Sequence, residues 1–202
     1  MYADSADPWR FESSEYERQK YAATLAALPR TRYENALEIG CSIGVLTAQL
    51  APRCDALLAV DVVDLALERA RRRCRAWPHV EFRKMHLPAE YPAGSFDLVV
   101  LSEVGYYWSE RDLALARERI IGGLAPGGHL LLVHWTQPSP DYPLTGDRVH
   151  QKFLDRPGDL LRHLDGQRAD TYRLDLFAAP LSSAGATATA GHAAAADRAS
   201  RR

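Results

Sequence analysis

The sequence predicts an α/β fold in which a mostly parallel sheet has helices on both faces. Between residues 36 and 133, short apolar runs alternate with longer amphipathic stretches, which is the pattern of repeated strand–helix–strand units. The chain has 202 residues, 47% of them hydrophobic, which suffices for one domain with a sizeable core. After residue 133, the pattern changes to two short segments that predict an antiparallel hairpin. We therefore expect one doubly wound α/β/α domain with a seven-stranded sheet.

The elements of the parallel part follow one another in regular order. An N-terminal helix is expected over residues 11–28, because aromatic and apolar residues recur there at helical spacing before Pro29. Ser13 or Ser14, followed by Glu17, offers this helix a capping box. The predicted strands are 36–39, 56–60, 80–82, 96–101 and 130–133. The predicted helices between them are 44–50, 63–77 and 111–124, the last stopped by Pro126 and two glycines.

The rest of the chain adds a hairpin and a tail. A Pro-rich loop, 137–144, leads into a short helix near 146–154. The hairpin consists of residues 160–164, a polar turn at 165–167, and residues 171–177, where apolar and charged residues alternate. From residue 179 on there is little to bury, so we expect a domain over residues 1–178, with a helical cover at about 8–30, and a disordered tail over 179–202.

Composition and charge exclude several classes of function. With 25 Lys and Arg against 26 Asp and Glu, the net charge is -1, so nucleic acid and membrane surfaces are poor partners. The first twenty residues contain no apolar signal region, and no apolar run approaches the roughly 18 residues of a membrane span, so we expect a cytoplasmic protein. Cys41, Cys54 and Cys74 form no Cys-x-x-Cys pair, which predicts small buried residues and no disulfide or metal site.

The strongest local motif lies where the first predicted strand turns into a helix. Glu38, Gly40, Ser42 and Gly44 form an acid-x-Gly-x-small-x-Gly loop, whose glycines leave room for a ligand at the helix N-terminus. The dinucleotide fingerprint would need glycine at Ser42 and Val45, which argues against a nicotinamide cofactor. The loop resembles the first motif of the class I S-adenosylmethionine methyltransferases, from which it departs by Ser42 in place of the middle glycine.

Further motifs extend this resemblance in the family's order. Asp61 ends the second predicted strand, where a carboxylate can bind both ribose hydroxyls of an adenosine; the alternative is that Asp61 caps the following helix. Residues 94–103 and 124–132 look like the family's fourth strand and the turn into its fifth. The resemblance implies a Rossmann-like class I methyltransferase fold with S-adenosylmethionine as cofactor. The residues that it marks for cofactor binding are Glu38, Gly40, Cys41, Ser42, Gly44, Asp61, Val62, Met85, His86, Leu87, Ser102 and Glu103.

A more specific resemblance extends from Asp7 to Phe177. Its motifs are Asp7-Pro8-Trp9-Arg10-Phe11, Ser14-x-Tyr16-Glu17-x-x-Lys20-Tyr21, Ser102-Glu103-Val104-Gly105-Tyr106-Tyr107, Gly146-Asp147-x-Val149-His150 and Tyr172-Arg173-Leu174-Asp175-Leu176. Together they look like the NodS group of nodulation proteins. This resemblance implies N-methylation of the free amine on the non-reducing-end glucosamine of a deacetylated chitooligosaccharide, during synthesis of nodulation signals.

Candidate catalytic groups follow the fourth and fifth predicted strands, whose carboxyl ends meet beside the glycine loop. Glu103 and His134 are candidates for removing or holding the proton of an acceptor amine. Structural alternatives stay open for both, because Glu103 can cap a helix or face the cofactor, and His134 can be a satisfied histidine at a strand end. Aromatic residues near this edge suit sugar faces or a sulfonium, and Tyr106 is also a catalytic candidate. These aromatic residues are Tyr106, Tyr107, Trp108 and Trp135.

Residues outside the core motifs complete the predicted site. The N-terminal helix is expected to cover the methionine end of the cofactor, with contributions from Trp9, Tyr16 and Lys20. Lys20 is available to pair with a carboxylate, and a solvated side chain is the alternative. Asp147 and His150 are expected to line the acceptor cleft.

Three other interpretations stay open on the sequence alone. A methyltransferase could act on another small-molecule amine or hydroxyl. A protein with this loop could bind S-adenosylmethionine without transferring its methyl group, because the loop residues bind and do not catalyse. A nicotinamide oxidoreductase is the most remote, since the loop spacing argues against it.

Overall fold

The computed structural model describes residue 7, residues 11–155 and residues 160–181. In this part of the chain seven strands form one sheet, in the order β3-β2-β1-β4-β5-β7-β6. The first five strands in that order pair in parallel, whereas β7 is antiparallel to both β5 and β6. The strands are β1 (Tyr33–Ile39), β2 (Cys54–Asp61), β3 (Val80–Lys84), β4 (Phe96–Ser102), β5 (Leu124–Trp135), β6 (Arg162–Arg168) and β7 (Tyr172–Ala178). The predicted mixed seven-stranded sheet is confirmed.

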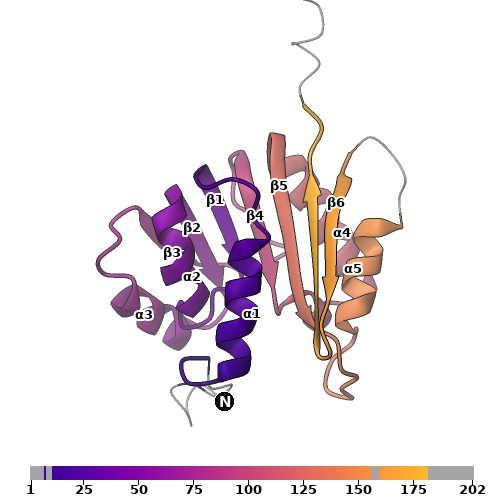
Figure 1. Ribbon diagram of the computed structural model, residues 1–202, viewed down its shortest axis with the longest axis horizontal. Helices are drawn as coiled ribbons and strands as arrows, with labels where there is room; N and C mark the ends of the chain where they lie inside the picture. The colour runs from indigo at the N-terminus through magenta and orange to yellow at the C-terminus, as the bar shows by residue number, and fades with distance from the viewer. Residues whose placement is uncertain (1–6, 8–10, 156–159, 182–202) are drawn as a thin grey trace, which may run out of the picture.

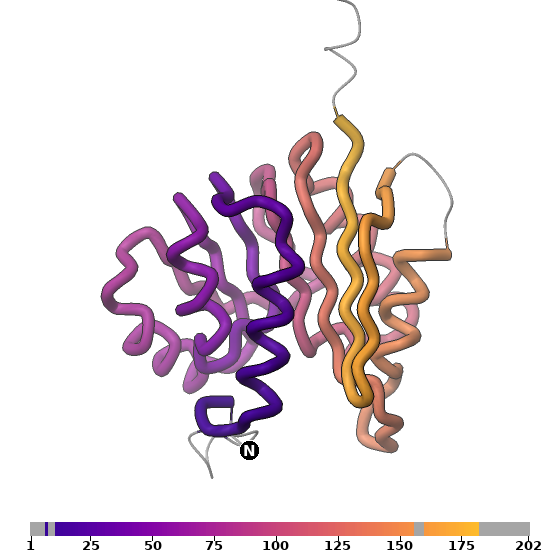
Figure 2. Tube along the Cα trace, in the orientation of Figure 1, coloured from indigo at the N-terminus to yellow at the C-terminus, as the bar shows by residue number. Residues whose placement is uncertain are grey.

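Helices cover both faces of the sheet (Figures 1 and 2). Each face has its own core of buried side chains. The α-helices are α1 (Glu15–Ala26), α2 (Val45–Leu50), α3 (Asp64–Arg73), α4 (Glu110–Gly123) and α5 (Gly146–Leu154), with 3-10 helices η1 (Ala51–Arg53) and η2 (Gly105–Tyr107). Apolar residues of α1 and α2 pack in one buried cluster, and those of α4 and α5 in another. The three-layer α/β/α arrangement therefore follows from strands that are apolar on both faces.

Local signals in the sequence place the helix starts. Ser14 precedes α1, and its hydroxyl accepts the Glu17 N–H at 3.4 Å. The reciprocal half of the predicted capping box is not formed, because the Glu17 carboxylate accepts from Lys20 instead. Ser109 and Thr145 cap α4 and α5 in the same way, accepting the N–H groups of residues 112 and 148. The short helix predicted near 146–154 is α5, and its predicted bounds are correct.

The predicted turn of the C-terminal hairpin is wrong. Residues 165–167 lie inside β6, and the chain reverses over 169–171, where the Ala169 N–H donates to the Tyr172 carbonyl. Gly166 is opposite Asp175, and a Cβ at Gly166 would lie 2.8 Å from Asp175 Oδ1. The glycine therefore permits close approach of a buried carboxylate, and it does not mark a turn.

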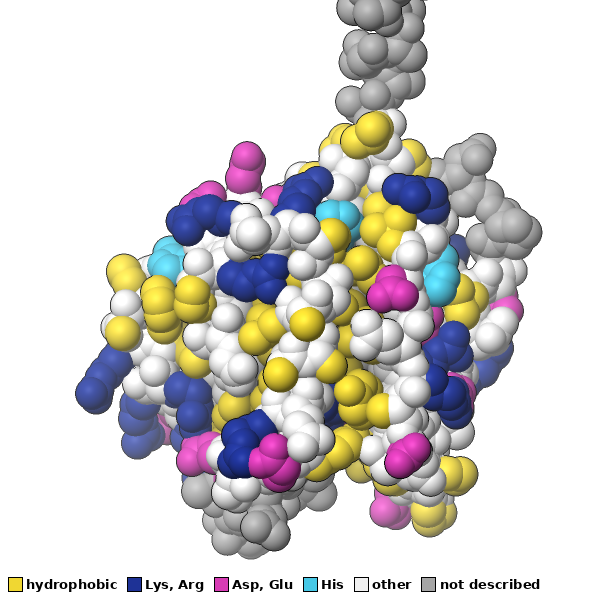
Figure 3. All heavy atoms as spheres, in the orientation of Figure 1, with side chains coloured by type: hydrophobic (Ala, Val, Ile, Leu, Met, Phe, Trp, Pro, Cys, Tyr) yellow, Lys and Arg dark blue, Asp and Glu magenta, His cyan; other side chains and the backbone are white. Residues whose placement is uncertain are grey.

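The sheet continues slightly beyond the last strand. The Ala179 N–H donates to the Gly128 carbonyl at 2.8 Å, and the Gly127 N–H donates to the Pro180 carbonyl at 3.0 Å. Residues 182–202 of the expected tail lie outside the described residues. Among the described residues, none of the helices has the length and apolar character needed to cross a bilayer. Charged side chains of both signs are scattered over the face that carries α1 (Figure 3).

Candidate functional site

The glycine loop connects β1 to α2 and needs three left-handed residues. Gly40, Ser42 and Gly44 have φ angles of 87°, 49° and 77°. A Cβ at Gly40 would lie 2.1 Å from Val104 Cγ2, so only glycine allows the loop to approach the segment after β4. Ser42 adopts the left-handed conformation without being glycine, which such residues do rarely. The loop therefore keeps its shape despite the departure from the three-glycine motif.

Asp61 joins this loop to the end of β2. Its Oδ2 accepts the Ser42 N–H at 2.9 Å, and its Oδ1 accepts the Val63 N–H at 3.0 Å, just before α3. Burial raises the pKa of the Asp61 carboxyl group, and the backbone donors act in the opposite direction. Each carboxylate oxygen can accept a second hydrogen bond, so Asp61 has capacity left for a ligand. The N-cap of α3 is Val63, which has no side-chain cap, so Asp61 holds the segment before the helix and does not cap it as the alternative had it. This position is compatible with a ribose-binding role.

Glu38 is a buried carboxyl group with an unused acceptor. It is 1% exposed, and among the described residues its Oε2 has no hydrogen-bond partner. Burial raises the pKa of Glu38 to about 7, while the Thr47 hydroxyl lowers it and Asp61 raises it further. A buried polar atom without a partner is costly, and a cationic ligand group at this position would supply the partner. This buried acceptor fits the amino group of a bound amino-acid cofactor.

Glu103 lies at the centre of a second group of side chains, where α1, β4, η2 and β5 meet. We call it the Glu103 group, and its members are Glu17, Lys20, Glu103 and Tyr106. Its Oε1 accepts from Lys20 Nζ at 2.6 Å. Its Oε2 accepts from the Tyr106 hydroxyl at 2.8 Å and from the Trp135 N–H at 2.9 Å. Lys20 is buried and also donates to Glu17 Oε1 at 3.0 Å. The predicted pairing of Lys20 with a carboxylate is confirmed, and Glu17 is a partner that the sequence did not reveal.

The buried side of Glu17 and Lys20 extends this group along α1. Oε2 of Glu17 is buried and has no hydrogen-bond partner among the described residues. Burial raises the pKa of Glu17, although Lys20 opposes this. Burial would lower the pKa of Lys20, but Glu103 and Glu17 outweigh it and raise this pKa. Lys20 therefore stays charged between two carboxyl groups, and one more acid than base is gathered here.

His134 does not have the geometry of a base that acts on an acceptor. It is 0% exposed, its Nε2 accepts the Gly105 N–H at 3.1 Å, and its Nδ1 is 3.1 Å from His150 Nε2. Both ring nitrogens are therefore occupied, and the catalytic assignment of His134 does not agree with this structure. His150 is equally buried, so it does not line an open cleft as expected. The structural alternative for His134, a satisfied histidine at a strand end, describes its position.

Aromatic side chains surround the exposed side of the Glu103 group. Tyr107 is 46% exposed, whereas Tyr106 is 6% exposed. Tyr142, from the loop 137–144, stacks on Tyr106 with ring centroids 4.7 Å apart and lies 4.8 Å from the Tyr107 ring. Trp135 meets Tyr142 edge-on at 6.4 Å. Tyr142 carries no signal in the sequence, because it lies in a Pro-rich loop without periodicity.

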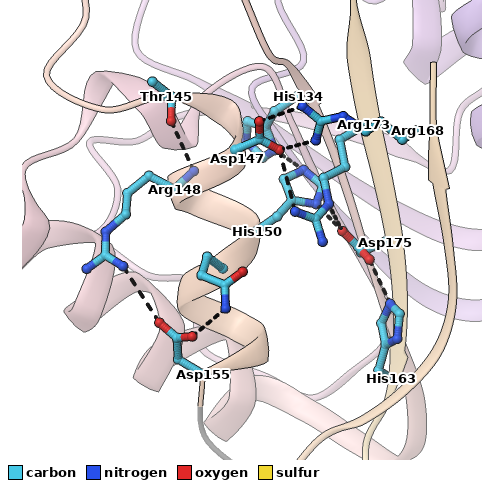
Figure 4. A network of polar contacts seen from close by, with 11 residues as sticks. His134, Thr145, Asp147, Arg148, His150, Asp155, His163, Arg168, Arg173 and Asp175 are labelled. Carbon is cyan, nitrogen blue, oxygen red and sulfur yellow. Dashed lines mark hydrogen bonds and ion pairs between the residues drawn. The ribbon is translucent and has the colours of Figure 1, made fainter. Parts of the chain in front are cut away.

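The remaining predicted site residues are distributed around these groups. Trp9 lies outside the described residues, and Tyr16 is half-buried with Lys20 Nζ 5.0 Å from its ring centroid. His86 is exposed and within 3.4 Å of Glu90 Oε2. Asp147 accepts from Arg168 and Arg173 at the surface end of α5 (Figure 4). Cys41 and Ser102 are buried, whereas Met85 and Leu87 are half-buried and Val62 is exposed.

The chain is similar in sequence to a known protein family. The family model "Nodulation protein S (NodS)" matches residues 2–135. The nodulation protein S of Rhizobium tropici is 37% identical over 127 residues, which are 62% of this chain and 53% of that protein. Its counterpart in Bradyrhizobium diazoefficiens is 36% identical over 127 residues, 62% of this chain and 61% of that protein. The matched segment thus takes in little more than half the length of these relatives.

A solved structure extends the comparison over most of the chain. The N-methyltransferase NodS of Bradyrhizobium japonicum WM9, in complex with S-adenosyl-L-homocysteine, has a TM-score of 0.77 and 29% identity. The superposition covers 87% of this chain and 93% of that one. The family model takes in more than half of the chain and includes the glycine loop, Asp61 and Glu103. This chain belongs to the nodulation protein S family.

Proposed function

We propose that this protein transfers a methyl group from S-adenosylmethionine to a primary amine in the cytoplasm. The acceptor that we propose is the non-reducing-end glucosamine of a deacetylated chitooligosaccharide, an intermediate of nodulation signals. The observation that carries the proposal is the Glu103 group, an acidic set of side chains beside the glycine loop, in a chain that matches the nodulation protein S model. The related NodS bound to S-adenosyl-L-homocysteine supports the choice of cofactor.

The cofactor-binding part of the proposal rests on Glu38, Asp61 and the loop between them. Bound S-adenosylmethionine would supply an electrophilic methyl group next to the carboxyl ends of β1 and β4. Asp61 has acceptor capacity for ribose hydroxyls, and Glu38 offers a buried acceptor to an ammonium group. Gly40, Cys41, Ser42 and Gly44 form the loop along which the cofactor would lie.

Glu103 is suited to hold and orient an acceptor amine. Its Oε2 already accepts two hydrogen bonds, whereas Oε1 accepts one, from Lys20, and has capacity for one more. An amine that donates to Oε1 would be held in one orientation, which is the main requirement of an in-line displacement. The amine attacks in its neutral form, after its solution proton has gone to water, and its nitrogen bonds to the methyl carbon as the C–S bond of the sulfonium breaks. We therefore assign to Glu103 the orientation of this amine and not full proton removal.

The aromatic residues are suited to enclose the acceptor sugar. Tyr107 and Tyr142 present rings at the exposed side of the group, and aromatic rings pack well against the apolar faces of sugars. The two carboxyl groups of Glu17 and Glu103 share one positive charge, that of Lys20. The remaining negative charge favours a cationic sulfonium, and it favours a basic amine over an acetylated nitrogen. This charge preference is the physical basis for expecting the deacetylated acceptor.

The deciding experiment compares two chitooligosaccharides that differ only at the terminal nitrogen. Transfer of a labelled methyl group should occur to the oligomer deacetylated at its non-reducing end and not to the fully acetylated one. Equal transfer to both would contradict amine selection by the acidic group. Release of S-adenosylhomocysteine should require the acceptor, and its absence with every amine would leave a binding protein without transferase activity.

A simple amine serves as the second arm of this experiment. The chain is 25% identical over 121 residues to phosphoethanolamine N-methyltransferase 1 of Arabidopsis thaliana, so phosphoethanolamine is an informative competitor. A kcat/KM for phosphoethanolamine as high as that for the sugar would move the acceptor to small amines. We expect the sugar to be favoured, since phosphoethanolamine has no apolar ring face that could pack against Tyr107 and Tyr142.

A further inference from the structure

A chain of buried polar side chains lies behind the turn that carries Tyr106, and the function proposed above does not use it. His134 on β5 and His150 on α5 are 0% exposed, and Asp175 on β7 is 1% exposed. His134 Nδ1 is 3.1 Å from His150 Nε2, and His150 Nδ1 is 2.6 Å from Asp175 Oδ2 (Figure 4). Burying three titratable groups costs free energy unless each has its hydrogen bonds.

The hydrogen bonds that join Gly105, His134, His150 and Asp175 all point in one direction, and the backbone determines that direction. The Gly105 N–H can only donate, and it donates to His134 Nε2 at 3.1 Å. His134 must therefore carry its proton on Nδ1 and donate it to His150 Nε2. His150 must in turn carry its proton on Nδ1 and donate it to Asp175. Both histidines are thus neutral, and burial, the largest influence on each, lowers both pKa values.

Asp175 lies at the far end of this series of hydrogen bonds and accepts from several donors. Besides His150, its Oδ2 accepts from Arg173 Nε at 2.6 Å, and its Oδ1 is 2.7 Å from His163 Nε2. Burial would raise the pKa of Asp175, but the hydrogen bond from His150, the charge of Arg173 and the hydrogen bond from His163 hold it below its usual value. The carboxylate therefore stays ionised and can only accept, which keeps the direction of both histidines.

At its other end, this series of hydrogen bonds begins at Gly105, the first residue of η2. The first N–H groups of a helix have no partner within it, and His134 supplies one to Gly105. A Cβ at Gly105 would lie 2.6 Å from Val149 Cγ1 and 3.0 Å from His134 Nε2, so this approach requires glycine. The next residue is Tyr106, whose hydroxyl donates to Glu103 Oε2 at 2.8 Å. The series of hydrogen bonds therefore ends at Gly105, one residue before Tyr106, whose hydroxyl orients Glu103.

We propose that His134, His150 and Asp175 are positioning residues, which hold the η2 turn so that the Tyr106 hydroxyl stays directed at Glu103. Apolar side chains could fill the same space, but they would leave the Gly105 N–H without a partner and the turn without a fixed orientation. The catalytic consequence rests on the methyltransferase activity proposed above, whereas the hydrogen-bond direction does not.

The first test determines which ring nitrogen of His134 and His150 donates its hydrogen bond, and it requires no enzyme activity. Nitrogen-15 NMR of the histidine side chains distinguishes protonation on Nδ1 from protonation on Nε2, with the signals assigned through His134→Gln and His150→Gln. We expect the Nδ1–H form for both histidines at neutral pH. An Nε2–H form of His134 could not accept the Gly105 N–H, and this result would overturn the proposal.

The second test separates positioning from stability. His150→Phe keeps a ring at this position but removes both hydrogen bonds, and we expect kcat to fall about tenfold while the cofactor Kd changes less than about twofold. His150→Gln should recover part of kcat, because an amide can both donate and accept. Phe153→Leu is the matched control, since Phe153 is a buried residue of the same helix with an apolar side chain. An equal loss of kcat in this control, at a similar loss of Tm, would show that the role is only structural.

A third measurement keeps the failure of this proposal distinct from the failure of the proposed function. Carbon-13 signals of the Tyr106 ring should shift in His150→Phe toward those in Glu103→Gln, because both changes disturb the same hydrogen bond. Unchanged Tyr106 signals in His150→Phe would overturn positioning. A protein that transfers no methyl group to any acceptor would defeat the proposed function, and the Tyr106 signals would still decide this one.

Discussion

Glu38 shows how a single buried group ties stability to ligand binding. Its carboxyl group is 1% exposed, one of its oxygens has no hydrogen-bond partner in the described part of the chain, and burial raises its pKa to about 7. Above pH 7 the native protein must hold this charge without full compensation, whereas the unfolded chain exposes it to water. A position that suits a cationic ligand therefore weakens the protein without its ligand.

Glu38→Gln should stabilise the ligand-free protein at alkaline pH. Between pH 4.5 and about 7 the native state binds a proton that the unfolded chain has lost, so rising pH costs the wild type stability through this group. The variant lacks this loss, which amounts to about 3 kcal/mol from the displaced pKa. Urea unfolding at pH 5 and pH 8 measures the free energy of unfolding, and calorimetry with S-adenosylmethionine should show weaker binding. Glu34→Gln, on the exposed side of β1, should change neither result.

Tyr106→Phe tests the hydrogen bond to Glu103 most directly. The change removes the hydroxyl that donates to Glu103 Oε2 at 2.8 Å and keeps the ring that stacks on Tyr142. A hydrogen bond to a charged group contributes about 1.5–3 kcal/mol, so we expect kcat to fall about tenfold or more. Cofactor affinity should stay near that of the wild type. Tyr91→Phe removes another buried hydroxyl, one without a partner among the described residues, and kcat should be unaffected.

Helix α1 buries two charged side chains of opposite sign on the face that packs on the sheet. Glu17, Lys20 and Thr24 are buried there, together with Tyr21. The sequence predicted a helix at this place, but apolar periodicity alone gave too long a range, 11–28 against Glu15–Ala26. The Ser14 cap decides where the helix begins. Packing of α1 on the sheet therefore depends on ionic contacts that periodicity does not reveal.

Lys20→Gln should loosen α1 without unfolding the domain. Lys20 lies between Glu17 and Glu103, and its loss leaves two carboxyl groups close together at a cost of about 3 kcal/mol. Hydrogen exchange should speed up for α1 amides and remain slow in β1 and β4, which pair in the sheet centre. Arg18→Gln is the control, because Arg18 pairs with Glu15 on the exposed side of the same helix. Equal acceleration in both variants would contradict an ionic anchor at Lys20.

The sheet was predictable from the sequence, whereas parts of the hairpin were not. Apolar runs defined β1 to β4 closely, since strands buried on both faces must be apolar throughout. The strand predicted over 130–133 is longer, because β5 begins at Leu124 and includes the Pro126 and double-glycine segment that was expected only to stop the helix. The turn at 165–167 was misplaced, because Gly166 serves the close approach of Asp175, a residue nine positions later. A glycine that permits a tertiary contact and one that permits a turn look alike in a sequence.

The topology of the whole sheet brings the candidate site together. Strand order reverses between β1 and β4, and ligands of such sheets bind at the carboxyl ends beside that reversal. Motif order along the chain therefore predicted that Asp61 and Glu103 flank the glycine loop. It could not predict that Tyr142 stacks on Tyr106, or that His134 faces inward to His150. Those contacts depend on how α5 and the loop before it pack, and this packing has no local signature.

Acid sensitivity of the folded protein should reflect its buried histidines. His150 has a pKa below 6.5 in the native state, so below about pH 6.5 the unfolded chain binds a proton that the native state refuses. Stability through this group is fully present above that pH and falls by up to about 1.4 kcal/mol per pH unit as the pH drops. His150→Gln removes the titration, so the wild-type advantage in unfolding free energy should be constant above pH 7.5 and shrink toward pH 5.5. The opposing titration of Glu38 is present in both proteins and cancels in the difference. Urea unfolding of both proteins across this range measures it, and a difference that stays constant down to pH 5.5 would mean that His150 can take up a proton where it lies.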